Sequence, residues 1–134
     1  MTVLVDTSAW IEFLRGTGGA EDRWLRAALA DERPLAWTEP ILLELASGAS
    51  TPRRAAELRA LLQRGPLLRV EGLGDWEAAA GLRRAARARG LAVRSPVDCL
   101  IAAVAVREAV PILARDRDYA VLARVSGLDL VDAG

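Results

Sequence analysis

Carboxylates are the residues of this sequence that could carry a reaction. The chain has no histidine, and all 18 of its basic residues are arginine, so it has no lysine either. These absences exclude a Ser-His-Asp or Cys-His nucleophile, an imidazole-ligated metal, a phosphate-loop lysine and a Schiff base. The acids placed beside expected strands and helices are the remaining candidates: Asp6, Glu44, Asp98, Asp116 and Asp118.

Acids that converge from separate segments repel one another and raise each other's pKa unless a cation neutralises them. Carboxylate and water ligands suit Mg²⁺ or Mn²⁺, which also bind phosphate oxygens and lower the pKa of a bound water. A cluster of these acids would therefore predict metal-dependent hydrolysis of a phosphodiester. That reaction needs neither a histidine nor a covalent intermediate.

The alternation of short apolar runs with longer helical stretches predicts an α/β fold. We expect strands at 3–5, 35–37, 67–70, 111–114 and 128–131. We expect helices at 7–14, 20–30, 38–47, 53–64, 75–89, 95–108 and 118–124. Apolar strands separated by helices are typical of a parallel sheet covered on both faces, where functional groups gather beyond the carboxyl ends of the strands. Asp6 and Asp116 follow two of these strands and should lie at that edge.

Length and composition indicate the number of domains, the surface charge and the cellular compartment of this protein. A chain of 134 residues and 14.4 kDa fits one domain spanning 1–134. The net charge is zero, so a basic surface for nucleic acid must be local. A single cysteine, Cys99, suggests a reducing, cytoplasmic compartment, and we find neither a signal peptide nor an apolar stretch of the roughly 20 residues that span a membrane.

Four short acidic blocks follow one another along the chain: DTSAWI at 6–11, ILLELASG at 41–48, SPVDCLIA at 95–102 and ARDRDY at 114–119. In sequence and order they resemble the blocks of PIN-domain ribonucleases, and the match is closest to the VapC-type toxins of bacterial toxin–antitoxin pairs. The resemblance covers nearly the whole chain. It implies a single PIN-like domain with a five-stranded parallel sheet in the order 3-2-1-4-5 and helices on both faces.

The resemblance also implies an activity and partners. Such a protein is an endoribonuclease toxin that requires Mg²⁺ or Mn²⁺ and hydrolyses RNA, such as tRNA or rRNA loops, with a metal-activated water. Its expected partners are the RNA substrate, a cognate VapB-like antitoxin and a second copy in a homodimer. The four tryptophans, Trp10, Trp24, Trp37 and Trp76, could belong to the core, and the resemblance allows that Trp10 or Trp24 instead borders the apolar groove that takes the antitoxin.

By block position, the resemblance assigns catalytic and metal-binding roles to Asp6, Glu44, Asp98 and Asp116, with Asp118 as an accessory metal ligand. Thr7 and Ser8 are expected to support the first acid or the water of the metal. Tyr119 stands where phenylalanine is frequent in the family, and we expect no consequence from that difference.

Arginines are the candidates for holding RNA. Arg15, Arg115 and Arg117 adjoin the acidic blocks and are placed to contact a scissile phosphate. Arg83, Arg84 and Arg87 share one expected helix, which would either line an RNA groove through phosphate contacts or be a solvated face.

Some of the acids have a structural alternative. Asp6 could simply be the cap of the first helix. Asp98 is the fourth residue of an S-x-x-D capping pattern that begins at Ser95, so its role could also be structural. Asp116 and Asp118 could have no role beyond forming a turn. Glu44 fits a structural role poorly, because its apolar neighbours in sequence suggest burial, and an unpartnered buried glutamate is costly.

Other classes of protein also compete. A haloacid-dehalogenase-like phosphatase needs a second aspartate two residues after the first, where this chain has Ser8, and a receiver domain needs a lysine. A nuclease acting on DNA would use the same chemistry. A catalytically inactive PIN-fold module that binds RNA or protein would be expected to have lost one of the acids, and none is missing.

Overall fold

The computed structural model describes all 134 residues. The elements in chain order are β1 (Val3–Val5), α1 (Thr7–Arg15), α2 (Ala20–Ala30), β2 (Leu35–Ala36), α3 (Glu39–Ser47), α4 (Pro52–Leu62), α5 (Gly72–Ala88), α6 (Pro96–Glu108), β3 (Ile112–Leu113) and α7 (Arg117–Arg124). Every expected helix is present, and no helix end differs from its expected position by more than three residues. None of the seven helices combines the length and the apolar composition needed to cross a bilayer.

The sheet is parallel and has β1 at its centre, between β2 and β3. Leu4 pairs with Ala36 of β2 on one side and with Ile112 of β3 on the other. All three residues of β1 are buried. The apolar run at 3–5 therefore forms a strand covered on both faces, as the sequence predicts, and its carboxyl end leads directly to Asp6.

The prediction of five strands is wrong, because the sheet has only three. The segments expected as the outer strands each form a single parallel bridge, one between Trp37 and Leu67 and the other between Ile112 and Leu130. β2 and β3 are themselves only two residues long, so the sheet is short on both sides of β1. The bridges still place segment 67–70 on the outer side of β2 and segment 128–131 on the outer side of β3, which agrees with the expected strand order 3-2-1-4-5.

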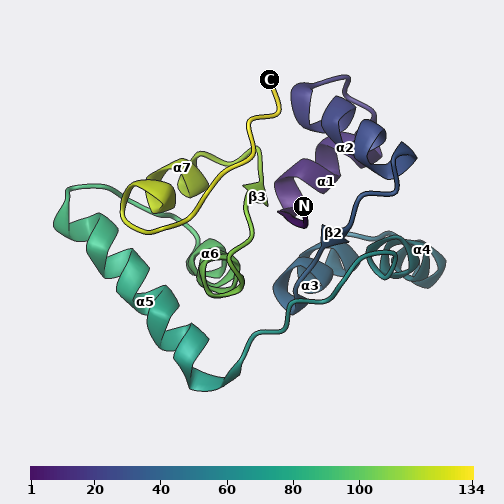
Figure 1. Ribbon diagram of the computed structural model, residues 1–134. Helices are drawn as coiled ribbons and strands as arrows, with labels where there is room; N and C mark the ends of the chain where they lie inside the picture. Colours follow the sequence, from purple (N-terminus) through teal and green to yellow (C-terminus); the bar gives the residue numbers. More distant parts are fainter.

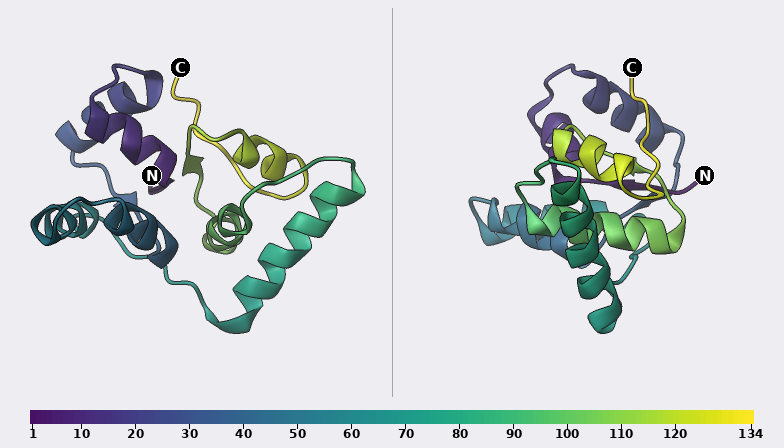
Figure 2. Two further views of the ribbon diagram at one scale, coloured as in Figure 1. Left: turned by 180° about the vertical axis from the view of Figure 1, so that it is seen from behind. Right: turned by 90° about the vertical axis from the view of Figure 1, so that its left-hand side faces the viewer.

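Helices surround this small sheet (Figures 1 and 2). α5 packs along α6 and α7, α1 packs on α2, and α3 packs on α4. In α6 every residue from Cys99 to Ala105 is buried, which fits its almost uncharged sequence. The core thus extends from β1 into α6, and the acidic blocks at the ends of these two elements are brought to one place.

Gly65 makes the crossing from α4 back to the sheet possible. A Cβ atom at this position would lie 1.7 Å from the carbonyl oxygen of Leu35, so no other residue fits there without moving the backbone. The carbonyl of Gly65 in turn accepts a hydrogen bond of 3.1 Å from the indole Nε1 of Trp37. This contact holds the segment after α4 against β2.

A partly buried ion pair joins the start of α5 to the end of α6. The Nε and Nη2 atoms of Arg107 each donate to the carboxylate of Asp75 at 3.0 Å. Nη2 also donates to the carbonyl of Arg69 at 2.7 Å, and Asp75 accepts from the backbone N–H of Glu71. Hydrogen bonding to Arg107 lowers the pKa of Asp75 below its usual value of 3.8.

We therefore expect Asp75→Asn to reduce the free energy of unfolding at pH 7 by about 1–3 kcal/mol, because Arg107 loses the most buried of its three carboxylate partners, Asp75, Glu71 and Glu108. An acid whose pKa is lower in the folded state stabilises the fold above its unfolded pKa and loses that effect as pH falls through its folded pKa. The difference in free energy of unfolding between the unmodified protein and Asp75→Asn should therefore begin to shrink below about pH 4, and it should disappear as the pH falls through the folded pKa of Asp75. Chemical denaturation at a series of pH values measures this difference, with Asp129→Asn as the exposed control. A difference in free energy of unfolding that does not change with pH would contradict the ion-pair explanation.

Candidate metal centre

Asp6 is the acid that follows β1. Its carboxylate caps α1 by accepting from the backbone N–H of Ser8 at 3.0 Å, and it accepts from the Ser8 hydroxyl at 2.6 Å. The residue is 3% exposed. The capping role considered for Asp6 is therefore real, but both contacts fall on one oxygen, Oδ2, and leave Oδ1 facing other groups.

The structure brings three further acids together. Asp98 lies in the first turn of α6, Asp116 caps α7 after β3, and Asp118 lies in the first turn of α7. One carboxylate oxygen from each lies within 4.8 Å of the others. The two helix N-termini that meet here provide favourable dipoles for negative charge, which explains in part how the cluster is tolerated.

Asp118 is the most firmly held of these acids. Its Oδ2 atom accepts from the backbone N–H groups of Arg94 and Ser95 at 3.1 and 3.3 Å, and the residue is 2% exposed. Asp116 accepts from the N–H of Asp118 at 2.9 Å. These bonds tie the loop before α6 to the start of α7, so that the two acidic blocks keep their spacing.

The carboxylate of Asp98 is not a helix cap. Ser95 accepts from the N–H of Asp98, as in a capping box, but the return bond is missing because the N–H of Ser95 donates to Asp118 instead. The Oδ2 atom of Asp98 is buried and has no hydrogen-bond partner. Burial, followed by the charges of Asp6, Asp116, Asp118 and Glu44, raises the pKa of Asp98 to about 8.

Glu44 approaches the cluster from α3. Its Oε1 atom accepts from the Thr7 hydroxyl at 2.9 Å. Partial burial raises the pKa of Glu44, the Thr7 bond opposes that shift, and the charges of Asp6 and Asp116 add to it. The residue is nevertheless exposed, so the expectation that Glu44 is buried was wrong: it stands at the wall of an open cleft.

Thr7 and Ser8 both contact the acids, from the first turn of α1. Thr7 holds Glu44, and the Ser8 hydroxyl donates to Asp6 while it accepts from the backbone N–H of Arg115 at 2.9 Å. Ser8 therefore links the acid after β1 to the segment after β3.

Tyr119 is a residue of the site whose contribution the sequence did not reveal. Its ring is 1% exposed, and its hydroxyl donates to Oδ1 of Asp6 at 2.7 Å and lies 3.4 Å from Oδ1 of Asp98. Burial, followed by the negative charge of Asp6, raises the pKa of Tyr119 well above its usual value. The difference from the family's frequent phenylalanine was the available signal, and the expectation that it has no consequence overlooks these contacts.

The residues present suit a hard divalent cation. All the donors are carboxylate oxygens, with hydroxyls behind them, and this donor set matches Mg²⁺ or Mn²⁺. The buried, unpartnered Oδ2 of Asp98 is an oxygen that a cation would satisfy. A positive ion would also offset the repulsion that raises the pKa of Asp98.

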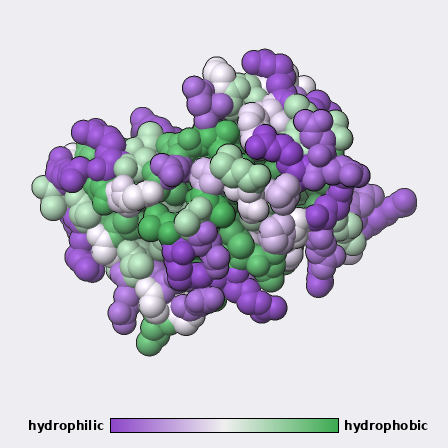
Figure 3. Space-filling view, in the orientation of Figure 1, coloured by the Kyte–Doolittle hydropathy of each residue, from purple (hydrophilic) through white to green (hydrophobic).

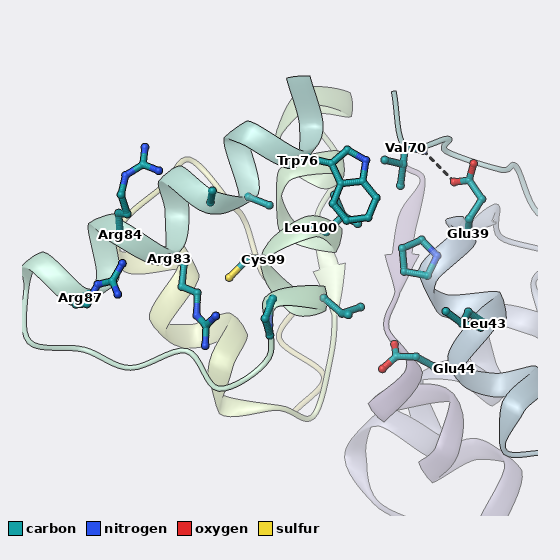
Figure 4. A pocket seen from close by; sticks show the side chains of 15 residues that line it. Glu39, Leu43, Glu44, Val70, Trp76, Arg83, Arg84, Arg87, Cys99 and Leu100 are labelled. Carbon is teal, nitrogen blue, oxygen red and sulfur yellow. Dashed lines mark hydrogen bonds between the residues drawn. The ribbon is translucent and has the colours of Figure 1, made fainter. Parts of the chain in front are cut away.

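A cleft of about 760 Å³ opens beside the acids (Figure 4). Glu44 on α3 lies on one side of it, and Arg83, Arg84 and Arg87 on α5 lie on the other. Leu43 and Trp76, both largely exposed, also line it. Seen in the orientation of Figure 1, the molecular surface shows hydrophobic areas between hydrophilic ones (Figure 3).

The other three candidate arginines are placed differently. Arg15 lines a separate pocket of about 320 Å³ together with Thr7 and Glu44. Arg115 forms an ion pair with Glu12, and Arg117 is exposed at the start of α7. The six arginines therefore do not line one pocket, and only Arg83, Arg84 and Arg87 line the cleft of about 760 Å³ together with Glu44.

The tryptophans divide between core and surface. Trp10 and Trp37 are buried, whereas Trp76 is exposed. Trp24 is partly buried, with the guanidinium of Arg33 5.0 Å from its ring centre. Trp10 is 2% exposed and belongs to the core, so of the two residues expected to border an antitoxin groove only Trp24 presents a surface.

Comparison with known proteins agrees with this geometry. Residues 3–126 match the PIN domain family. The chain is 43% identical to VapC ribonuclease Mb1587 of Mycobacterium bovis over 127 residues, which are 94% of this chain and 95% of that protein.

Two solved structures also share the fold. The VapBC2 structure from Rickettsia felis, bound to a DNA fragment from its promoter, has a TM-score of 0.75 at 18% identity, covering 98% of both chains. A VapBC-5 toxin–antitoxin structure from Mycobacterium tuberculosis has a TM-score of 0.63 at 27% identity, covering 97% of both chains. With a family match over most of its length and a relative of this identity, the chain belongs to the PIN-domain family and, within it, to the VapC ribonucleases.

Proposed function

We propose that this protein is an endoribonuclease toxin that depends on Mg²⁺ or Mn²⁺ and cleaves phosphodiester bonds in RNA, such as those of tRNA or rRNA loops. The observation that carries the proposal is the cluster of Asp98, Asp116 and Asp118 oxygens within 4.8 Å, with one oxygen of Asp98 buried and unpartnered. The 43% identity to a VapC ribonuclease supports the choice of RNA over DNA.

The acids would hold the ion from three sides. Asp98, Asp116 and Asp118 offer clustered oxygens, Asp6 stands beside Asp98 across the Tyr119 hydroxyl, and Glu44 faces them from α3. Mg²⁺ or Mn²⁺ bound there would supply positive charge for a phosphate and a water of lowered pKa. Thr7 and Ser8 orient the carboxylates of Glu44 and Asp6 through their hydroxyls.

The cleft beside the acids suits an RNA backbone. Arg83, Arg84 and Arg87 line it, and arginine contacts to phosphates hold a nucleic acid without reading its sequence. Because Glu44 lines the same cleft, a strand held by these arginines would pass close to the acids. Arg15, Arg115 and Arg117 are secondary candidates for phosphate contact, and Arg115 would first have to leave Glu12.

A VapB-like antitoxin is the proposed protein partner. The structural relatives include VapBC toxin–antitoxin complexes. An antitoxin segment with an apolar face and a basic residue would suit a surface in which apolar side chains lie beside unneutralised carboxylates. A homodimer is also a prediction from the family resemblance. An inactive module is not favoured, since every expected acid is present.

The test is cleavage of total RNA by the purified protein. We expect cleavage with Mg²⁺ or Mn²⁺, none in excess EDTA, and 5′-phosphate ends, because a water and not the 2′-hydroxyl attacks the phosphorus. Sequencing of the new 5′ ends would identify the target. We also predict that a small antitoxin is encoded beside this protein, and its addition should suppress the same cleavage.

Three results would contradict all or part of the proposal. Full activity in EDTA would exclude a role for the ion, and 2′,3′-cyclic phosphate products would show that the RNA itself supplies the nucleophile. Cleavage of single-stranded DNA at an equal rate would retain the metal mechanism but overturn the assignment of RNA as substrate.

A further inference from the structure

We propose that the hydroxyl of Tyr119 is a positioning group for the metal site, which sets the relative placement of Asp6 and Asp98 before the ion binds. The inference rests on the proposed function, since it concerns how this chain prepares the same carboxylates. It adds a residue from outside the acidic set, and it depends on an oxygen that a phenylalanine at this position would lack.

The geometry is that of one donor between two acids. The Tyr119 hydroxyl donates to Oδ1 of Asp6 at 2.7 Å and lies 3.4 Å from Oδ1 of Asp98. A hydroxyl has a single hydrogen, so the short contact to Asp6 is the full hydrogen bond and Asp98 is held at the longer distance. The ring is 1% exposed, so water does not replace this donor when it is lost.

The bond completes the fixation of Asp6. Oδ2 of Asp6 accepts from the N–H and the hydroxyl of Ser8, both in the first turn of α1. Oδ1 accepts from Tyr119 on α7. The carboxylate is thus held by donors from two helices, and without Tyr119 it would be held at one oxygen only.

The bond also places a dipole between two like charges. When the carboxyl groups of Asp6 and Asp98 are both ionised they repel each other, and Asp116, Asp118 and Glu44 add to the negative field on Asp98. A neutral hydroxyl between the two carboxylates keeps them near one another without cancelling the charge that a cation needs. Loss of the hydroxyl would allow them to separate, and an ion would have to draw them together again on binding.

Groups that orient metal ligands typically change metal affinity by about 10–100-fold when they are removed. Tyr119→Phe retains the ring and removes only the oxygen. We therefore expect calorimetric titration of the metal-free protein with Mn²⁺ to give a Kd at least about tenfold higher for Tyr119→Phe than for the unmodified chain. The melting temperature in EDTA should fall by a few degrees.

Ser126→Ala is the matched control. Ser126 follows α7, and its hydroxyl donates to the carbonyl of Leu122 at 2.7 Å and accepts from the N–H of Leu128, with no contact to the acids. This variant also loses one hydroxyl and its hydrogen bonds from the α7 region. Its melting temperature should fall while its Kd for Mn²⁺ stays within twofold, so that affinity separates positioning from general stability.

A second measurement needs no variant. Tyr119 is the only tyrosine of the chain, so ¹³Cζ-labelled tyrosine gives one NMR signal. Titration with diamagnetic Mg²⁺ should shift this signal with the same Kd that calorimetry gives for Mg²⁺. A signal that does not move while calorimetry shows saturation would overturn the inference.

The outcomes separate the two proposals. If the unmodified chain binds neither Mn²⁺ nor Mg²⁺, the proposed metal-dependent function fails, and this inference fails with it. If the unmodified chain binds and Tyr119→Phe binds equally well, the metal site stands and the positioning role of Tyr119 alone is overturned.

Discussion

Replacing Asp98 with asparagine is expected to reduce RNA cleavage by at least about 100-fold while the protein stays folded. Asparagine has nearly the same size, but its amide cannot supply the charge of the carboxylate. Asp98 contributes the buried oxygen that has no other partner, so its loss removes a ligand that no neighbour replaces. Single-turnover cleavage at saturating Mg²⁺ measures the effect.

The same substitution should not destabilise the metal-free protein. The pKa of Asp98 is raised from 3.8 to about 8 in the folded state, mainly by burial. A folded state that holds a proton more tightly than the unfolded state loses stability as pH rises between those two values. Asp98→Asn lacks this titration, so its melting temperature in EDTA should exceed that of the unmodified chain at pH 8 and approach it near pH 4.

Asp129→Asn provides the control for Asp98→Asn. Asp129 is exposed and lies outside the acidic blocks, so its neutralisation should change cleavage by no more than a few-fold. Near-normal cleavage by Asp98→Asn at saturating Mg²⁺ would show that Asp98 is not a ligand. The site would then have to be rebuilt around Asp6, Glu44 and Asp116.

Neutralising Glu44 is expected to have the second largest effect, a loss of about 100-fold in single-turnover cleavage for Glu44→Gln. Glu44 is the one acid of the site that α3 contributes, and it stands where the cleft meets the other carboxylates. Glutamine can still accept the hydrogen bond from Thr7, so the local structure should persist. The loss then reports the missing charge and not a displaced helix.

Glu57→Gln is the matched control for this second variant. Glu57 is an exposed glutamate of α4 whose partners are Arg53 and Arg54, and such surface pairs contribute little to stability. It should retain cleavage within a few-fold. If Glu44→Gln behaved like Glu57→Gln, Glu44 would belong to the cleft wall only, and the ion would be held by the aspartates.

Much of this architecture could be predicted from local sequence. The apolar run at 3–5 ends at Asp6, and Ser95 and Pro96 start a helix, because these signals act between residues close in the chain. The absence of histidine and lysine left carboxylates as the reactive groups, and the order of the acidic blocks indicated the family. Helix positions and the identity of the clustered acids therefore followed from the sequence.

The tertiary structure decided what depends on partners distant in the chain. The apolar segments at 67–70 and 128–131 look like strands, but each makes only a single bridge, because strand pairing depends on backbone groups that distant parts of the chain present and not on local apolar sequence. The S-x-x-D pattern cannot show that Asp118, 23 residues away, takes the N–H of Ser95 and leaves the Asp98 carboxylate free. Tyr119 meets Asp6 across 113 residues of chain, a contact set by the packing of α7 against the end of β1 and by no local preference.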